Sequence, residues 1–429
     1  MNESAGSQKV ELTPKQGRWM LRARKFAAEV LRPQAAAVDR DATYPREQLR
    51  LLGRSGMLAL PLPASKGGED ADVLTTALVI LELAKGCAST AMCAAMHLST
   101  VPLLGALATG EQQMERFIAP LLRGEFLGAS AVSEFGSGSR VWHTDGHAEE
   151  TETGWQLTAD KSFVTNAGEA DFYVVPVRSR HGADASDMSL FVIEGALHRV
   201  ERRTAWDAMG FRGSLSSPVR FEKAPVPRYA LLGPAGSGFS MMVLFHFPLY
   251  HVGLSALFIG IAEASLSDAI AHVKGRIHVD TGAALSSVET VQGYVGTMRM
   301  RIDQARAVLA RVARLADRAV RVMSQIAELG LADELTQRML NDDDFFMDVA
   351  GLKVVATECA VDVTNMAVQL CGGAAYHRGH PVERHYRDAR AGTVMAPNND
   401  SLRLIIGQQL LGYPLPWDRP GKPTDSGRR

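Results

Sequence analysis

Residues 369–400 read QLCGGAAYHRGHPVERHYRDARAGTVMAPNND, and the rest of the chain is best understood outward from this stretch. A helix rich in Ala and Val runs into Gln369, and the pair Gly372-Gly373 stops it. Adjacent glycines permit positive φ angles and a close approach of the backbone to a large group. The pair therefore marks either a ligand contact or an ordinary corner between two helices.

Composition is that of an ordinary globular protein with room for two or three domains. The chain has 429 residues, 46 % of them hydrophobic, and its 46 Lys and Arg nearly balance 47 Asp and Glu. That balance gives no sign of nucleic-acid binding. The cysteines form no CxxC pair and no Cys/His cluster with zinc spacing. We therefore expect reduced, buried thiols in a cytoplasmic protein, and no metal site.

Two segments bear on targeting and membrane insertion. The N-terminus, MNESAGSQKVELTP, is polar and lacks the apolar core of a signal peptide. Residues 243–262 are the most hydrophobic run and are about long enough to span a bilayer. His246, Pro248 and His251 interrupt that run, and no basic clusters flank it. We expect a buried core helix there and no membrane association.

The order of local patterns predicts an α+β multidomain fold. Residues 1–125 read as an N-terminal helical domain, with Thr13-Pro14 as its first helix start. Residues 126–235 change to short, turn-separated strand patterns, typical of a β-barrel or a sandwich. Residues 236–412 return to long helices, at 240–274, 284–329, 342–370 and 399–411, which indicate a C-terminal four-helix bundle. Residues 413–429 read as a flexible tail.

Two motifs in the β domain could hold a flat heteroaromatic ring. The first, SAVSEFGSGSR at 130–140, would place Ser133 and its backbone on a strand edge. The second, KSFVTNAGEADF at 161–172, puts Phe163 and Thr165 on the same strand face, where a ring could be packed and hydrogen-bonded. A polar turn at a strand end is the alternative interpretation of the first motif.

These motifs, in this order, resemble those of the acyl-CoA dehydrogenase family of flavoproteins. SEFGSGSR is similar to the family's Thr-Glu-Pro-x-x-Gly-Ser-Asp motif, and KSFVTN to its Lys-x-x-Ile-Thr-Asn segment. The stretch at 369–389 resembles its Gln-x-x-Gly-Gly-x-Gly-Tyr…Pro-x-Glu-Arg…Arg-Asp-Ala signature. The resemblance extends from about residue 20 to about residue 412 and implies the family's helical domain, β-barrel domain and four-helix bundle.

The resemblance implies FAD as the cofactor and assigns two groups of residues to it. The first group would meet the isoalloxazine or lie close to it: Ser130, Val132, Ser133, Gly138, Ser139, Phe163 and Thr165. The second would contact the pyrophosphate and adenine side across a subunit interface: Arg276, Gln292, Gln369, Gly372, Gly373, Asn398 and Asp400. A site of this kind implies a homodimer or homotetramer.

The catalytic base of the family is missing at both of its usual positions. Counting on from Arg387-Asp388-Ala389 places Ala396 where most members have Glu, and the alternative position on the first bundle helix is Tyr250. The base must reach the substrate α-carbon, so His251, which should face the same cavity, is the first candidate for it. Tyr250 could orient the substrate, and His251 could equally be a buried structural histidine.

Three functions remain open at this point. The first is oxidation of an acyl thioester, carried by CoA or by a carrier protein, with an electron-transfer partner or oxygen as acceptor. The second is a flavin monooxygenase of the same fold, which needs no α-proton base and could use His97, His251 and Ser139. The third is a non-catalytic FAD-binding subunit.

Overall fold

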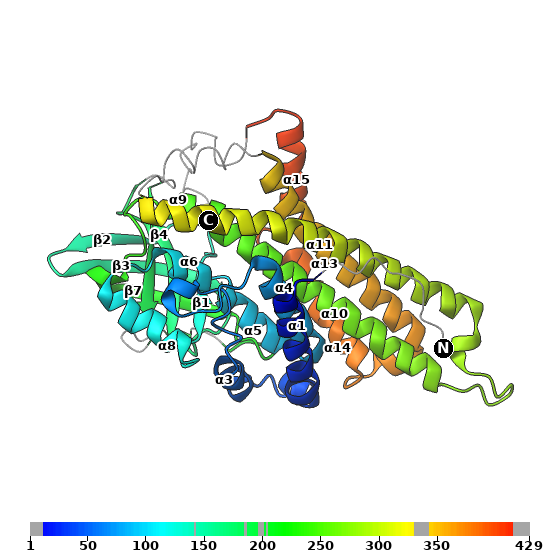
Figure 1. Cartoon of the computed structure of the whole chain (residues 1–429). Coiled ribbons are helices and arrows are strands. Elements are labelled where there is room, and N and C mark those ends of the chain that lie inside the picture. Colours follow the sequence, from blue (N-terminus) through cyan, green and yellow to red (C-terminus); the bar gives the residue numbers. More distant parts are fainter. Residues whose placement is uncertain are drawn as a thin grey trace.

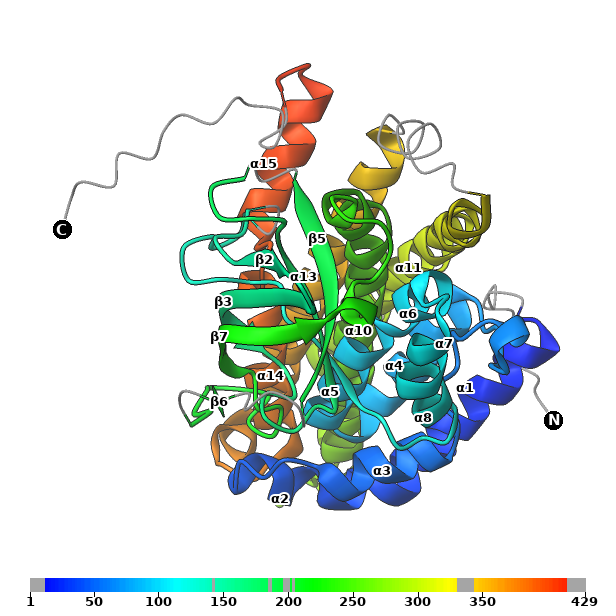
Figure 2. The same cartoon turned by 90° about the vertical axis from the view of Figure 1, so that its left-hand side faces the viewer.

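The computed structural model describes residues 12–140, 143–183, 187–195, 201–202, 205–329 and 343–414. A curled sheet lies at one end of the molecule, and long helices run away from it (Figure 1). The helices of the first third lie beside both the sheet and the bundle, with α2 (Ala35–Arg40) and α3 (Arg46–Arg54) along the lower edge of the view (Figure 2). The tail predicted at 413–429 lies, from residue 415 on, outside the described residues.

The first third of the chain is helical, as predicted. Its helices are α1 (Pro14–Phe26), α2 (Ala35–Arg40), α3 (Arg46–Arg54), α4 (Val73–Gly86), α5 (Ala88–Leu98), α6 (Val101–Leu107), α7 (Glu111–Gln113) and α8 (Ala119–Leu122). Thr13 caps α1 in a capping box with Gln16, which confirms the predicted start. Most residues of α4 and α5 are buried, because α4 packs against both α1 and the first bundle helix.

The middle third forms one seven-stranded sheet. Its strands are β1 (Gly128–Ser130), β2 (His147–Thr151), β3 (Gly154–Val164), β4 (Phe172–Arg178), β5 (Met188–Glu194), β6 (Glu201–Arg202) and β7 (Ser217–Pro227). Their order is β1-β4-β2-β3-β7-β6, with β5 antiparallel to β4. The described strands share one curled sheet, so the sandwich alternative, which requires two sheets, is wrong.

The last third contains the bundle, although its fourth helix is not the predicted one. The helical segments are α9 (Gly238–Met241), η6 (Met242–His246), α10 (Phe247–Gly275), α11 (Glu289–Leu329), α13 (Asp343–Cys371), η8 (Gly372–Tyr376), α14 (Pro381–Val394) and α15 (Asn399–Leu410). The bundle consists of α10, α11, α13 and α14, since α14 packs on both α10 and α13. Helix α15, the predicted fourth member, packs mainly against the first part of α13, at Ala350 and Val354, and projects away (Figure 1).

Helix α14 was not recognised in the sequence because its buried face is partly polar. Pro381 stands at its first turn and the His380 ring accepts the Val382 N–H, so it begins with an ordinary capping arrangement. Its buried positions include His385 and Asp388 as well as Val382 and Ala389. Helical spacing is present, but charged residues at buried positions conceal the apolar stripe.

The same helix connects all three domains. The Arg387 guanidinium pairs with the Asp39 carboxylate of the N-terminal domain at 2.6 Å and also donates to the Met209 carbonyl of the middle domain. The adjacent Asp388 carboxylate accepts the Phe211 N–H at 2.6 Å. Because Asp388 is buried, its pKa is raised to about 7. The stretch that opened the sequence analysis thus fixes the relative positions of the domains.

Within the part of the chain that the structure describes, two helical segments are long and apolar enough to cross a membrane, Ala88–Leu107 and Gly238–Gly275. Both are largely buried inside the structure. Their apolar composition is therefore explained by packing in the core, as predicted for residues 243–262. All four cysteines are free and buried, also as predicted.

Candidate active site

A cavity of about 730 Å³ lies where the sheet meets the bundle. Its size is within the range of pockets that enclose cofactors and drug-sized ligands. It is lined by β-domain residues on one side, by η6 and α10 on another, and by the end of α14 and the loop after it. Met92 and Met96 of α5 complete the lining from the N-terminal domain.

The sheet side of the cavity contains the predicted ring-contact residues. Ser130, Val132, Ser133, Phe163 and Thr165 all line it. Phe163 is 64 % exposed although its neighbours on β3 are buried, so a large aromatic surface is open to the cavity. The Thr165 hydroxyl lies 2.8 Å from the Ser216 hydroxyl, which fixes its position. The arrangement provides an apolar face beside hydroxyl groups.

A buried ion pair supports this wall from behind. The Lys161 ammonium donates to the Glu134 carboxylate at 2.7 Å and to the Pro176 carbonyl at 2.9 Å. Glu134 also accepts the Thr144 hydroxyl and the Asp145 N–H. The Lys161 charge and these hydrogen bonds outweigh desolvation and lower the pKa of Glu134. Glu134 is thus a paired anion and is not available as a base.

The rim of the cavity joins the β domain to the loop before α15. The Asn398 N–H donates to the Ser139 hydroxyl at 3.2 Å, and the Asn398 side chain caps α15 through the Ser401 N–H. Gly138 has φ +55°, and a Cβ added there would have no atom within 4 Å. The Asp400 side chain, by contrast, is 96 % exposed and is not among the cavity-lining residues.

The helical wall brings Tyr250, His251 and Ala396 together, as predicted. The Tyr250 hydroxyl donates to the Ala396 carbonyl at 3.2 Å, so the two usual base positions are in contact and neither holds a carboxylate. Burial raises the pKa of Tyr250. The described lining includes one carboxylate residue, Glu134, which is already paired with Lys161.

His251 has a defined tautomer and no exposed surface. Its Nδ1 lies 2.7 Å from the Phe247 carbonyl oxygen, which only accepts, so Nδ1 carries the proton. Its Nε2 is buried and has no hydrogen-bond partner among the described residues. Burial lowers the pKa of His251 to about 3. His251 therefore has a free lone pair in the wall, behind the Phe247 and Tyr250 rings, which contact it.

Two functional residues were missed in the sequence. His246 lines the cavity with its Nε2 2.9 Å from the Ser130 hydroxyl, and burial lowers its pKa to about 4. Lys353, in the middle of α13, donates to the Pro397 carbonyl at 3.0 Å and the Asn399 side chain at 2.9 Å, and so holds the loop that carries Ala396. His246 was hidden in an apolar run, and Lys353 reads as a surface lysine.

His97, considered for oxygen chemistry, is a structural residue. Its Nε2 lies 2.9 Å from the Leu58 carbonyl, and its Nδ1 accepts the Gly128 N–H at 2.7 Å. Both ring nitrogens are therefore occupied inside the protein, and His97 does not line the cavity. That expectation was wrong because the sequence does not reveal which histidines already have partners.

The remaining predicted cofactor residues lie at the far end of the bundle (Figure 1). These five residues do not line the cavity. They are Arg276, Gln292, Gln369, Gly372 and Gly373. Arg276 ends α10, and the Gln292 side chain donates to the Ser286 carbonyl at 3.1 Å. Gly372 has φ +57°, and a Cβ added at Gly372 or Gly373 would have no atom within 4 Å. This surface has space that the chain itself does not fill.

The residues present fit FAD in two separate places. The cavity offers the exposed Phe163 ring and nearby hydroxyl groups to a flat heteroaromatic system. The far end offers a guanidinium, two amides and open glycines, a set suited to a diphosphate. The two places lie at opposite ends of the bundle, so one extended cofactor could use both only if two chains were placed side by side.

Comparison with known proteins matches all three parts of the chain to the same family. Residues 13–125, 129–224 and 252–399 match the models of the acyl-CoA dehydrogenase N-terminal, middle and C-terminal domains, respectively. The human mitochondrial short-chain specific acyl-CoA dehydrogenase is 28 % identical over 406 residues, covering 94 % of this chain and 92 % of that protein.

Solved structures agree with the sequence matches. Butyryl-CoA dehydrogenase from Megasphaera elsdenii superposes with a TM-score of 0.82 at 27 % identity, covering 94 % of this chain and all of that one. Dibenzothiophene monooxygenase from Paenibacillus superposes with a TM-score of 0.78 at 21 % identity, covering 94 % of this chain and 99 % of that one. The second likeness shows the fold alone.

Proposed function

The chain belongs to the acyl-CoA dehydrogenase family of FAD-dependent oxidoreductases, and we propose that it oxidises an acyl thioester between its α and β carbons. The observation that carries the proposal is the cavity, in which the exposed Phe163 ring faces a site otherwise lined mainly by apolar side chains. That site has room for both a flavin ring and an acyl chain.

FAD would be held by two groups of residues. Val132, Ser133, Phe163 and Thr165 would contact its ring, while Arg276, Gln292, Gln369, Gly372 and Gly373 of a second chain would contact its diphosphate and adenine side. FAD, when bound, accepts the β-hydrogen of the substrate as a hydride. The open far end of the bundle supports this arrangement and, with it, a homodimer or homotetramer.

The proton acceptor in this proposal is His251. Its Nε2 lone pair is free, and the bond from Nδ1 to the Phe247 carbonyl orients the ring and remains available when the ring is protonated. With a pKa near 3 the imidazole is neutral at ordinary pH. Its protonated form needs a nearby negative charge, which the substrate enolate provides as the α-proton leaves.

Access to His251 requires a local movement. The side chain is fully buried, and the Phe247 and Tyr250 rings cover it. Binding of a substrate would have to displace one of these rings for the α-carbon to reach Nε2. The Tyr250 hydroxyl, which now donates to the Ala396 carbonyl, would then be free to orient the thioester carbonyl.

The second candidate is a flavin monooxygenase, favoured by the lack of an unpaired carboxylate in the described cavity lining. Such a reaction needs oxygen and no α-proton base. Ser139 and His251 remain available to it, whereas His97 does not. A non-catalytic FAD-binding subunit is the third outcome.

Four finer points belong to the same proposal. The thioester is carried by CoA or by an acyl carrier protein, and the electrons pass to an electron-transfer partner or to oxygen. The apolar lining by Met92, Met96 and Met209 suits a hydrophobic acyl group. We place the protein in the cytoplasm, which is consistent with its free cysteines.

The deciding experiment is anaerobic flavin reduction. The FAD-loaded enzyme is mixed with butyryl-CoA, longer acyl-CoAs and the corresponding carrier-protein thioesters, and bleaching of the flavin is followed by stopped flow. Bleaching by any thioester supports the dehydrogenase. Absence of bleaching together with oxygen-dependent product formation from reduced flavin supports the monooxygenase, and bound FAD with neither activity supports the third outcome.

His251→Asn tests the base, because Asn retains a donor for the Phe247 carbonyl and lacks a basic nitrogen. We expect flavin reduction to slow by about 10²–10⁴-fold with FAD content unchanged. An unchanged rate would exclude His251. His246→Asn is the comparison: if it alone abolishes reduction, the base is His246, acting beside Ser130.

A further inference from the structure

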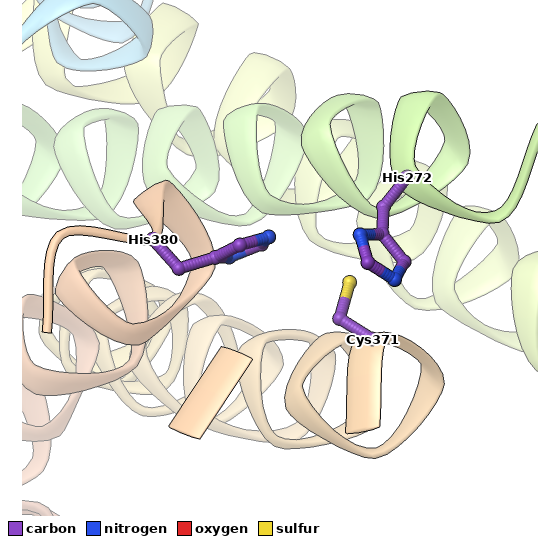
Figure 3. A group of neighbouring side chains, drawn as sticks. All are labelled: His272, Cys371 and His380. Carbon is purple, nitrogen blue, oxygen red and sulfur yellow. The ribbon is translucent and has the colours of Figure 1, made fainter. Parts of the chain in front are cut away.

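Three potential metal ligands converge at the far end of the bundle, two from neighbouring parts of the chain and one from a helix about a hundred residues earlier. His272 lies on α10, Cys371 is the last residue of α13, and His380 directly precedes α14. Their nitrogen and sulfur atoms all lie within 4.8 Å of one another. Figure 3 shows the two imidazole rings and the thiol directed toward a common point.

We propose that His272, Cys371 and His380 form a binding site for a zinc-type divalent cation. Two imidazoles and one thiolate are the donor types that zinc takes in proteins. Around a tetrahedral zinc ion such donors lie about 3.3–3.8 Å apart, so the group would contract by about 1 Å on binding. The fourth position would be filled by water, as in zinc sites with three protein ligands.

The surroundings suit this role. Cys371 is buried, whereas both histidines are half-buried, so an ion would enter from the histidine side while the sulfur is shielded. Burial and the nearby Asp268 carboxylate raise the pKa of the Cys371 thiol to about 11, so the metal itself must displace the thiol proton. No hydrogen bond involves the Cys371 sulfur or the His272 ring within the described residues, so these two donors need not break one to bind a metal.

Binding of a zinc ion would change the protonation of Cys371 and His380 in a defined way. The Cys371 thiol loses its proton to solvent when sulfur bonds to the metal, because the thiolate is the ligand. His380 accepts the Val382 N–H through Nδ1 at 3.3 Å, and Figure 3 shows one of its ring nitrogens directed at the other two ligands. For that nitrogen to bind a metal, Nδ1 must carry the ring proton. The long capping bond would therefore be exchanged for the metal bond.

The site would join the ends of three helical elements next to Gly372 and Gly373. It would hold the last turn of α10 to the end of α13 and the start of α14, where the chain turns between bundle helices. This role is structural and independent of the chemistry in the cavity, which lies at the opposite end of the bundle. Zinc content, rather than FAD content, is therefore the readout, because Gly372 and Gly373 also belong to the group that would contact FAD.

The test uses the full-length, FAD-loaded protein, stripped with a chelator and dialysed against Zn²⁺. We expect one retained zinc per chain by elemental mass spectrometry. X-ray absorption at the zinc edge should give one sulfur at about 2.3 Å and two nitrogens at about 2.0–2.1 Å. Retention well below one ion per chain, or a zinc shell without sulfur, overturns the proposal.

Matched variants identify the ligands. Cys371→Ser and His380→Asn should each weaken zinc binding at least about tenfold. Asn at 380 preserves a capping side chain for α14, so this variant tests the site even if Cys371→Ser does not fold. Cys359→Ser removes another buried thiol of α13 outside the group and should bind zinc like the unchanged protein. Equal binding by His380→Asn and the unchanged protein overturns the proposal.

Discussion

The two ends of the bundle carry the two halves of the residues that resemble FAD contacts, and they are built differently. At the sheet end, three domains of one chain enclose a cavity whose wall is backed by Glu134 and Lys161. At the far end, Gly373 faces open space, and Val279 and Tyr376 are almost entirely exposed. In the proposed function, one end of the cofactor site would be completed by folding and the other by association of two chains, and four predictions test this contrast.

The largest effect on stability is expected from Lys161→Met at the sheet end. It leaves the buried Glu134 carboxylate without its cation, which should lower the free energy of unfolding by about 3–5 kcal/mol. Because the wall at 132–134 would then relax, FAD should also bind more weakly. Urea unfolding and flavin content measure the two effects.

Arg220→Met is the control, because Arg220 pairs with Asp160 at the surface at 2.9 Å. Its effect should stay below about 1 kcal/mol. Equal losses for the two variants would show that the buried pair does not support the wall.

Acid should destabilise the sheet end through three buried histidines. Burial lowers the pKa values of His97 and His246 to about 4 and that of His251 to about 3, against about 6.5 in an unfolded chain. At a pH between the folded and the unfolded pKa values, each histidine is protonated in the unfolded chain and neutral in the folded one. The free energy of unfolding is therefore unaffected by these histidines above pH 6.5 and decreases as the pH falls below it. Each histidine contributes up to about 1.4 kcal/mol per pH unit.

Unfolding free energies measured between pH 7 and pH 4.5 check this expectation. The slope should become less steep when His97 is replaced by Gln, which can still hydrogen-bond but does not titrate. A stability that is flat across this range would contradict neutral, buried histidines.

A pair of glycine substitutions should separate the two ends. A Cβ at Gly392, inside the bundle, would lie 2.7 Å from Thr357 and 2.9 Å from the Phe258 ring. Gly392→Ala should therefore cost about 1–2 kcal/mol, after a gain in helix propensity. Gly373→Ala meets no atom and should change stability by less than about 0.5 kcal/mol while lowering FAD retention.

Thermal unfolding and flavin release on dilution measure these two substitutions. If Gly373→Ala retained FAD like the unchanged protein, the far end would not be a cofactor contact.

The smallest effect on folding is expected from Val279→Asp. Val279 is fully exposed in this chain, so unfolding of the monomer should change by less than about 0.5 kcal/mol. If a second chain covers it, the charge should weaken association by about 1–2 kcal/mol, seen by sedimentation equilibrium. Leu21→Asp is the control. Leu21 is exposed on α1, away from the far end of the bundle (Figure 1), and its replacement should leave association unchanged.

Much of the fold could be predicted from local patterns. The Thr13-Pro14 start, the change to strands after residue 125 and the long helices α10, α11 and α13 all follow from capping residues and periodicity. Helix α14 was not predicted because two of its buried residues are polar. Asp388 accepts a hydrogen bond from the Phe211 N–H, and His385 pairs with the Asp268 carboxylate. Partners that arrive from distant segments leave no periodic signal.

The candidate site was predictable where it follows motifs and not where it depends on contacts across the chain. Phe163 and Thr165 were found because strand alternation places them together. The contact between His246 and Ser130 joins positions 116 residues apart, and the group of His272, Cys371 and His380 joins α10 to segments about a hundred residues later. No local spacing rule can detect such groups, and none distinguishes a free histidine such as His251 from an occupied one such as His97.

The ion pair between Arg387 and Asp39 has a consequence for synthesis on the ribosome. The two partners are separated by 348 positions. At ordinary elongation rates the nascent chain spends on the order of 20–70 s between making Asp39 and making Arg387. Throughout that interval the N-terminal helices are exposed without the helix that will tie them to the middle domain. Early chaperone contact, or the slow release of a truncated chain, would therefore act on a molecule in which α14 does not yet tie Asp39 to the middle domain.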